Sequence, residues 1–285
     1  MALGLLGCHV SIEGGVQNAP LRGHELGCEA IQIFTRNQRQ WKSKAITEDQ
    51  VQEFRRKILE YQIQEVMTHS IYLINLASAD RNLRKRSETA FLDELHRCEA
   101  LGISYLVFHP GSYRESTEKK GINRLVNSLQ RLLAKTEENS VSVLLENTDG
   151  AGSLLGSSFE QLAEIRDQTG SLDRVKFCFD TAHAFAAGYD ICTPEGFNKV
   201  MDDFDRIIGL HHLKAFHIND SKADLGSHRD RHENIGYGYI GAPFFEKLVN
   251  DPRFEHHPMI LETPGGNDWF MKNLQLLFQF RNKGS

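Results

Sequence analysis

Residues 141–183 read VSVLLENTDGAGSLLGSSFEQLAEIRDQTGSLDRVKFCFDTAH, and this stretch alternates between two hydrophobic patterns. Residues 141–146 and 175–180 are short runs rich in Val, Leu and Phe, which is typical of strands that are covered on both faces. Between them, residues 159–170 carry apolar side chains at helical spacing and end at Gly170. The stretch therefore predicts a strand, a helix and a second strand that is parallel to the first.

The same alternation continues along the whole chain in both directions. Eight alternations without a break in composition favour a fold of the α/β class, a closed (β/α)8 TIM barrel, over a doubly wound open sheet, which would give a similar pattern. The length of 285 residues suits a single barrel domain over residues 1–285. The predicted strands are residues 5–9, 30–34, 65–69, 105–109, 141–146, 175–180, 213–219 and 259–262.

The composition is that of a globular chain, with 40% hydrophobic and 25% charged residues. Residues 1–10 are apolar but contain no basic leader, and no apolar run approaches the ~20 residues that span a bilayer. We therefore expect neither export nor a membrane partner, and place the chain in the cytoplasm. Five cysteines without a C-x-x-C pair predict packed thiols in a reducing compartment.

Residues that bind metal ions recur where the predicted strands end. In a barrel the carboxyl ends of all strands meet at one mouth, which is where such folds place their active sites. Three carboxylates and three imidazoles at one mouth would repel one another or stay protonated unless cations lay among them. The pattern therefore predicts a metal centre formed by His69, His109, Glu146, Asp180, His217 and Glu262.

Three further residues extend this set. His183 lies about one helical turn after Asp180, and Asp230 and His232 follow the seventh predicted strand. One tetrahedral site uses about four ligands, so nine residues with a bridging carboxylate predict two or three ions. Imidazole and carboxylate without thiolate suit Zn²⁺ best, with Mn²⁺ or Fe²⁺ as alternatives. Any one of these residues alone would more often be a cap or a surface group, so the joint pattern carries the prediction.

Other patterns limit the function. The net charge of −5 argues against a polyanionic partner, although three divalent ions would bring it to about +1. The first predicted strand is not followed by Gly-x-Gly-x-x-Gly, so we expect no nucleotide cofactor. The sequence also lacks a Gly-x-Ser-x-Gly turn and therefore offers no evident covalent nucleophile. His9 ends a strand as well, and it is a candidate for orienting a ligand from outside the metal sphere.

Eight motifs occur in an order that is familiar from one family. They are residues 7–11 with 14–15, 34–41, 69–76, 108–112, 145–148, 180–190, 217–232 and 260–263. Through them the sequence resembles, nearly end to end, the endonuclease IV family of zinc-dependent abasic-site endonucleases. It departs from the family pattern at Ser70, Ala182 and Tyr237, none of which is an expected metal ligand.

The resemblance implies a barrel with three Zn²⁺ ions that cleaves the phosphodiester bond 5′ to an abasic site in duplex DNA and leaves a 3′-hydroxyl. The resemblance also implies that one ion is held by His69, His109 and Glu146, and that Glu146 bridges to a second ion. The remaining ligands are Asp180, His217 and Glu262 for the second ion and His183, Asp230 and His232 for the third.

The resemblance further implies that Glu146 and Glu262 are catalytic, and that Glu262 orients the attacking water. The partner is duplex DNA with abasic sites or damaged 3′ ends, and we expect a monomer that acts in base excision repair at the nucleoid. The family inserts the residues that match Arg39, Tyr72 and Leu73 into DNA. A solvated basic loop is the alternative interpretation of the charged residues expected to bind phosphates, which are Arg36, Lys222 and Arg231.

Two other functions compete with this one. Sugar isomerases and epimerases of the xylose-isomerase-like barrels also place Glu, Asp and His at strand ends. They need fewer histidines and no third metal site, so His69, His109, His183 and residues 230–232 count against them. A DNA-binding barrel without catalysis is the second alternative, although binding alone would not need nine metal ligands.

Overall fold

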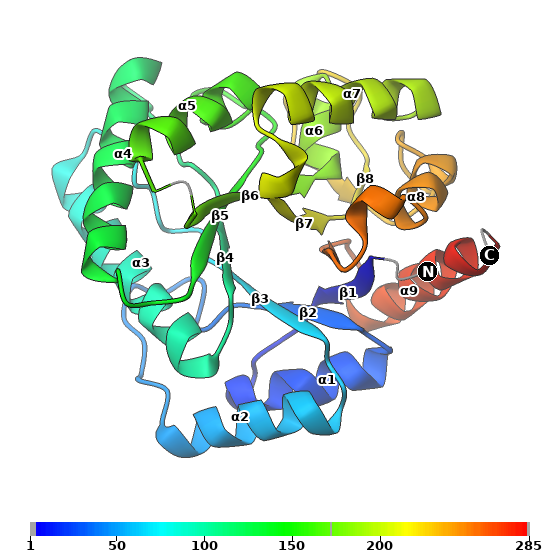
Figure 1. The fold of residues 1–285 in the computed structure, drawn as a ribbon, viewed down its shortest axis with the longest axis horizontal. Helices are drawn as coiled ribbons and strands as arrows, with labels where there is room; N and C mark the ends of the chain where they lie inside the picture. The colour runs from blue at the N-terminus through cyan, green and yellow to red at the C-terminus, as the bar shows by residue number, and fades with distance from the viewer. Residues whose placement is uncertain (1–3, 172, 284–285) are drawn as a thin grey trace.

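Eight parallel strands form a closed barrel in the computed structural model, which describes residues 4–171 and 173–283 (Figure 1). Strand β1 pairs with both β10 and β2, so the sheet has no open edge, and the doubly wound alternative is wrong. The barrel strands are β1 Leu5–His9, β2 Ala30–Ile33, β3 Glu65–His69, β4 Tyr105–Phe108, β5 Ser142–Glu146, β6 Val175–Asp180, β7 Leu213–His217 and β10 Pro258–Leu261.

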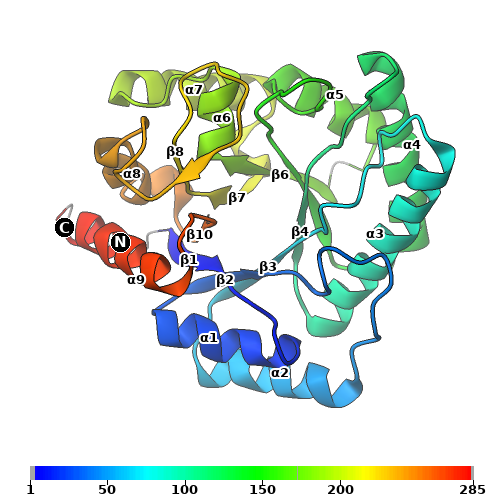
Figure 2. The same cartoon turned by 180° about the vertical axis from the view of Figure 1, so that it is seen from behind.

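The predicted strands are confirmed, with ends that shift by one or two residues. His109 and Glu262 lie one residue beyond β4 and β10, and β7 ends at His217 rather than at residue 219. The short strands β8 (Asp220–Ser221) and β9 (His232–Glu233) pair antiparallel outside the barrel. This small sheet comes from the chain that follows β7, and it lies close to α6 (Figure 2).

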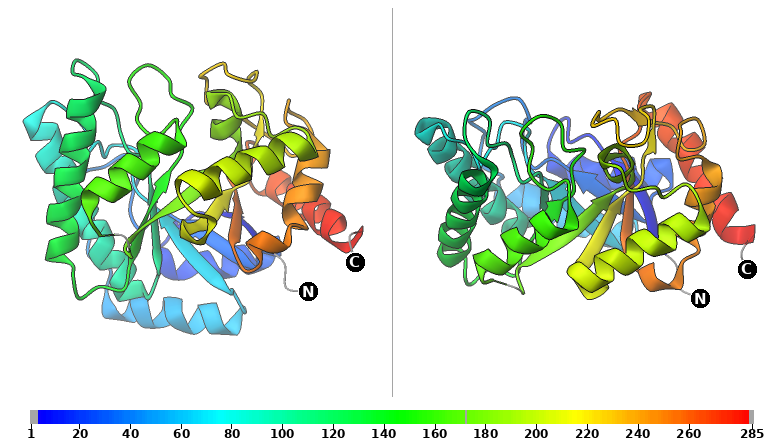
Figure 3. Two further views of the ribbon diagram at one scale, coloured as in Figure 1. Left: turned by 45° about the horizontal axis from the view of Figure 1, so that its top comes forward. Right: turned by 90° about the horizontal axis from the view of Figure 1, so that it is seen from above.

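Helices surround the strands, and the loops that follow the strands gather on one side (Figure 3). Helix α5 ends at Gly170, whose φ of 75° lies in the left-handed region that favours glycine. Helix α2 begins at Thr47 with a capping box. The helices are α1 Ala19–Leu26, α2 Glu48–Glu60, α3 Arg81–Leu101, α4 Glu118–Lys135, α5 Phe159–Thr169, α6 Thr181–Ala187, α7 Pro194–Ile207, α8 Ala242–Val249 and α9 Gly266–Lys283. The described residues also form the short 3-10 helices η1 Val16–Asn18, η2 Leu210–His212 and η3 Pro252–Phe254.

The core has two parts. A large cluster fills the space between the strands and the helices. A smaller, apolar layer fills the inside of the barrel, and it consists of Leu5, Ala30, Met67, Val107, Leu144, Cys178, Ala215 and Ile260. Successive side chains of a strand point to opposite faces, so the residue two positions after a member of this layer also points inward, one step nearer the mouth.

The five cysteines are free thiols, and four of them are buried, as expected of packed side chains. Among the described residues, none of the helices has the length and apolar character needed to cross a membrane.

Helix α3 carries a buried carboxyl group, that of Glu94. Glu94 is 1% exposed, and the backbone N–H of Ile71 donates to its Oε1 at 3.2 Å. Burial raises the pKa of Glu94 to about 8, because the charged form is poorly solvated there. The folded protein therefore keeps this carboxyl protonated near neutral pH.

We expect Glu94 to make the parent protein less stable as pH rises from about 5 to about 8, because the unfolded carboxyl ionises near ~4.3 while the folded one does not. Glu94→Gln should remove this loss and be the more stable protein at pH 8, by on the order of a few kcal/mol. Urea unfolding at both pH values measures the effect, with the exposed Glu25→Gln as control. Equal pH slopes for parent and Glu94→Gln would contradict the assignment.

Candidate metal centre at the barrel mouth

The mouth of the barrel is lined by a polar layer, which consists of the side chains two residues after those of the apolar layer. His69 comes two residues after Met67, and Glu146 comes two residues after Leu144. The same offset relates the other strand-end ligands to the apolar layer, namely His109, Asp180, His217 and Glu262. Strand alternation therefore points all six side chains into the same space, above a floor that excludes water.

Glu146 lies at the centre of this layer and is fully buried. Its Oε2 is 3.0 Å from His69 Nε2 and 3.2 Å from His109 Nε2. Its Oε1 is 2.9 Å from His217 Nδ1 and 3.3 Å from His183 Nδ1. Burial by itself raises the pKa of Glu146, but the positive field of His217 and His109 outweighs burial and holds the pKa well below its usual range.

Three overlapping groups among the described residues bring metal-binding atoms within 4.8 Å of one another. Glu146 belongs to two of them, and so does Asp180. The groups are His69 with His109 and Glu146, then Glu146 with Asp180, His217 and Glu262, and finally Asp180 with His183 and His232. The first two match the ligand sets that the resemblance implied.

The third group differs from the implied set in one respect. Asp180 completes it with His183 and His232, whereas Asp230 lies beside the same two histidines. Asp230 Oδ2 is 3.4 Å from His183 Nε2, and its Oδ1 is 3.3 Å from His232 Nε2. Partial burial raises the pKa of Asp230, but His183 outweighs this effect and lowers the pKa to about 2. Asp230 is half exposed, so it closes the group on the solvent side.

The hydrogen bonds of the histidines fit a bound cation. The Nδ1 atoms of His69 and His183 face the carbonyl oxygens of Ser70 and Asn147 at 2.7 and 3.0 Å. Because a carbonyl oxygen only accepts, each Nδ1 carries a proton, and the Nε2 of each ring is left facing a carboxylate. A lone pair turned toward a carboxylate at this distance is repulsive unless a proton or a metal ion lies between them. Imidazole nitrogen and carboxylate oxygen are suitable ligands for such an ion.

Outer contacts hold the carboxylates, and sequence reasoning missed the residues that make them. Asn219 donates from Nδ2 to Asp180 Oδ2 at 2.9 Å, and its Oδ1 accepts from the backbone N–H of Glu262 at 2.8 Å. Gln32 on β2 contacts Glu262 and His217. Gln32 comes two residues after Ala30 of the apolar layer, so the period of two along the strand was a usable signal.

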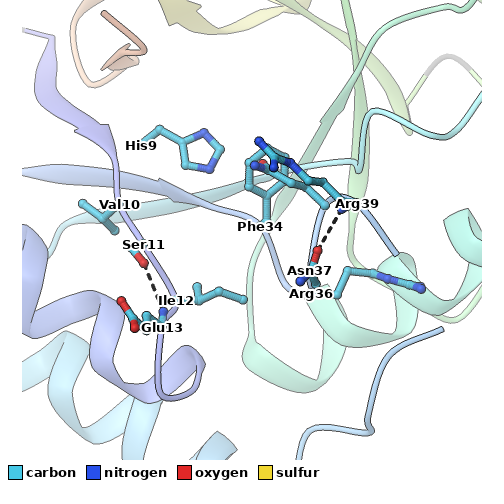
Figure 4. Close-up of a pocket in the computed structure, with 10 residues that line it drawn as sticks. His9, Val10, Ser11, Ile12, Glu13, Phe34, Arg36, Asn37 and Arg39 are labelled. Carbon is cyan, nitrogen blue, oxygen red and sulfur yellow. Dashed lines mark hydrogen bonds between the residues drawn. The ribbon is translucent and has the colours of Figure 1, made fainter. Parts of the chain in front are cut away.

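A cavity of about 680 Å³ opens beside this centre and is lined by His9, Phe34 and Arg39 among others (Figure 4). His9 Nδ1 lies 3.2 Å from Glu262 Oε1, which places it where it can orient that carboxylate. Tyr72 is 63% exposed, and its ring meets Phe34 edge-on at 5.5 Å between centroids. These side chains form an aromatic and basic rim beside the candidate metal ligands.

The six residues expected to contact DNA differ in their exposure to solvent. Arg39, Tyr72, Lys222 and Arg231 are exposed, and Leu73 is half-buried against the core. Arg36 is only 5% exposed and points away from His9 (Figure 4). Its guanidinium donates to Asp93 Oδ2 at 2.8 Å and to the backbone oxygen of Trp41. Arg36 therefore holds its own loop.

The closed barrel with histidines and carboxylates at its mouth defines a class of metal-binding α/β-barrel enzymes, and the family described as "Xylose isomerase-like TIM barrel" matches residues 22–280. "Probable endonuclease 4" of Geotalea daltonii is 46% identical over 271 residues, which cover 95% of each chain. The protein of the same description from Geobacter sulfurreducens is 47% identical over 92% of this chain and 89% of its own. The chain belongs to the endonuclease IV family and is a nuclease.

One solved structure agrees with this assignment, and a second shares the fold. The crystal structure of endonuclease IV from Thermus thermophilus is 33% identical with a TM-score of 0.88, and covers 98% of this chain and 99% of that one. A D-tagatose 3-epimerase-like protein is 19% identical with a TM-score of 0.75, and covers 100% of this chain and 98% of its own. At that identity the second likeness shows the fold alone.

We expect Glu146→Gln to lower metal binding at two groups at once. The reason is that Glu146 Oε2 faces His69 of one group, whereas Oε1 faces His217 of another. The affinity should fall by more than the ~10- to 100-fold that loss of an outer partner costs. His109→Ala should affect one group only. Zn²⁺ titration of the metal-depleted proteins measures both, with the exposed Glu164→Gln as control. Parent-like stoichiometry and affinity in Glu146→Gln would refute the shared role.

Proposed function

We propose that this nuclease hydrolyses the phosphodiester bond 5′ to abasic sites in duplex DNA, leaves a 3′-hydroxyl, and uses three Zn²⁺ ions per chain in base excision repair. The observation that carries the proposal is the set of three overlapping groups at one barrel mouth, which share Glu146 and Asp180. Family membership supports it, because the relatives are described as endonuclease 4.

The donor atoms support zinc. Imidazole nitrogens and carboxylate oxygens without thiolate suit Zn²⁺, and Mn²⁺ is the alternative. When bound, such ions activate water and stabilise the negative charge that develops on the phosphate. Three of them would also offset the formal charge of −5, which favours a polyanionic substrate at this mouth.

Glu262 is the carboxylate best placed to orient the attacking water. Of the three carboxylates in the central group, Glu146 and Asp180 have fully buried side chains, whereas 17% of the Glu262 side chain is exposed. Its backbone N–H is held by Asn219, so the side chain leaves the strand end in a defined direction. Glu262 thus reaches both the ligands and the solvent side, where substrate enters. Glu146 contacts imidazoles of all three groups and holds them close together.

The rim above the centre provides the DNA contacts. Arg39 and Tyr72 are exposed next to the cavity. Leu73, the residue after Tyr72, is partly buried and packs against the core. Side chains of this kind enter the minor groove, unstack the bases and help a damaged nucleotide leave the helix. Lys222 directly follows β8 and Arg231 directly precedes β9; both are exposed, Lys222 lies 3.8 Å from Glu233 Oε2, and both would bind phosphates. Arg36, which is buried and paired, is left out of this set.

Metal analysis combined with a cleavage assay tests the proposal. We expect about three Zn²⁺ per chain, and chelator-sensitive incision 5′ to a single abasic analogue in duplex DNA. Glu262→Gln should retain much of the metal and lose nearly all incision, because an amide cannot accept the proton of the attacking water. One or two ions without incision would instead favour a sugar isomerase, and parent-like turnover of Glu262→Gln would remove its catalytic role.

Arg39→Ala should weaken binding to abasic duplex by roughly tenfold, about 1.4 kcal/mol, and leave the metal content unchanged. The reason is that Arg39 is exposed at the cavity and contacts no metal-binding group. Fluorescence anisotropy with abasic and intact duplexes measures the change. Lys42→Ala is the matched control, because it removes an exposed cation of the same loop that does not line this cavity. Equal affinities for abasic DNA in Arg39→Ala and its parent would refute the contact.

A further inference from the structure

Gln32 is a buried amide in the polar layer of the barrel. It lies on β2, is 0% exposed, and pairs in register with His9 of β1. It occupies on β2 the position that His69 occupies on β3 and Glu146 on β5, two residues after the apolar layer. The chain thus places an uncharged side chain at a position where its neighbours carry ligands.

Both ends of the Gln32 amide are engaged. One end lies 2.6 Å from Glu262 Oε1 and 2.9 Å from His9 Nδ1, and the other lies 2.8 Å from His217 Nε2. A carboxylate only accepts hydrogen bonds, so the atom at Glu262 must be the NH₂ group. The oxygen then faces His217, and because an amide oxygen only accepts, His217 must carry its proton on Nε2.

This orientation determines which nitrogen of His217 is free for a ligand. With the proton on Nε2, the lone pair of His217 lies on Nδ1, which is 2.9 Å from Glu146 Oε1 and 3.5 Å from Glu262 Oε2. The Gln32 NH₂ group meanwhile holds Oε1 of Glu262 and leaves Oε2 on the side of the central group. A single amide therefore orients one imidazole and one carboxylate of the same group.

We propose that Gln32 is a positioning residue of the central metal group, which presents His217 through Nδ1 and Glu262 through Oε2. The inference rests on the proposed function, because it concerns the same site. The oxygen of Gln32 acts on metal binding through His217, and its NH₂ group acts on catalysis through Glu262. Outer hydrogen bonds of this kind raise metal affinity by keeping a ligand in one tautomer and one orientation.

Two substitutions separate the two ends of the amide. Gln32→Met has nearly the same volume and removes both hydrogen bonds. Gln32→Glu keeps an oxygen that accepts from His217 Nε2 and removes the donor to Glu262 Oε1. Gln161→Met on α5 is the control, because it makes the same change at a glutamine that accepts from the Gly156 N–H outside the mouth.

The experiment measures Zn²⁺ affinity of the metal-depleted proteins, the visible spectrum of their Co²⁺ forms, and kcat and KM for incision of an abasic duplex. We expect Gln32→Met to lose roughly 10- to 100-fold in affinity at one site, to change the Co²⁺ spectrum and to lose incision. Gln32→Glu should keep an affinity close to that of the parent and lose kcat about tenfold or more at similar KM. Gln161→Met should behave as the parent.

Parent-like Zn²⁺ affinity and Co²⁺ spectrum in Gln32→Met would overturn the role at His217, and parent-like kcat in Gln32→Glu would overturn the role at Glu262. Equal losses in both variants would show a merely structural glutamine and also overturn the proposal. If Gln32→Met does not fold, as circular dichroism would reveal, the separation of affinity from kcat in Gln32→Glu decides. A parent protein that binds Zn²⁺ without incising abasic DNA would refute the proposed function, while the affinity measurements would still test Gln32.

Discussion

The negative charge of Glu146, which is 0% exposed, is the constraint on which the rest of the mouth depends. A carboxylate removed from water costs several kcal/mol unless positive charge and hydrogen bonds compensate it. Here the compensation comes from the imidazoles of His69, His109, His183 and His217, which are delivered by four different parts of the chain. One buried carboxylate thus requires that β3, β4, β7 and α6 meet at the end of β5.

The barrel meets this requirement through strand alternation. Met67, Leu144 and Ala215 form part of a dry floor, and two residues further along their strands stand His69, Glu146 and His217. The floor keeps water from one side of the centre, so charges above it interact more strongly than they would in solvent. Helix α6 adds His183 because Asp180 caps that helix, accepting from the His183 N–H at 2.7 Å, and thereby joins two groups.

Two arginines in the loop after β2 have different roles. Arg36 and Arg39 lie three residues apart in the loop after β2. Arg36 pairs with Asp93 of α3 and with backbone oxygens of its own loop, which gives the loop its shape. Arg39 is left at the cavity with its side chain exposed. One arginine of this basic loop, Arg36, therefore has a structural role, and burial distinguishes it from the exposed Arg39.

The sequence by itself determined the alternation of strands and helices and the nine strand-end and loop residues expected to bind metal, because hydrophobic period and position along a strand are local properties. It predicted a closed barrel, which the pairing of β1 with β10 confirms. It could not determine that Asp180 reaches two groups or that Arg36 is buried. The inward position of Gln32 follows from the period of the strand, but its contacts with Glu262 and His217 do not. Each of these facts depends on contacts between residues far apart in the chain, and only tertiary packing decides which of them meet.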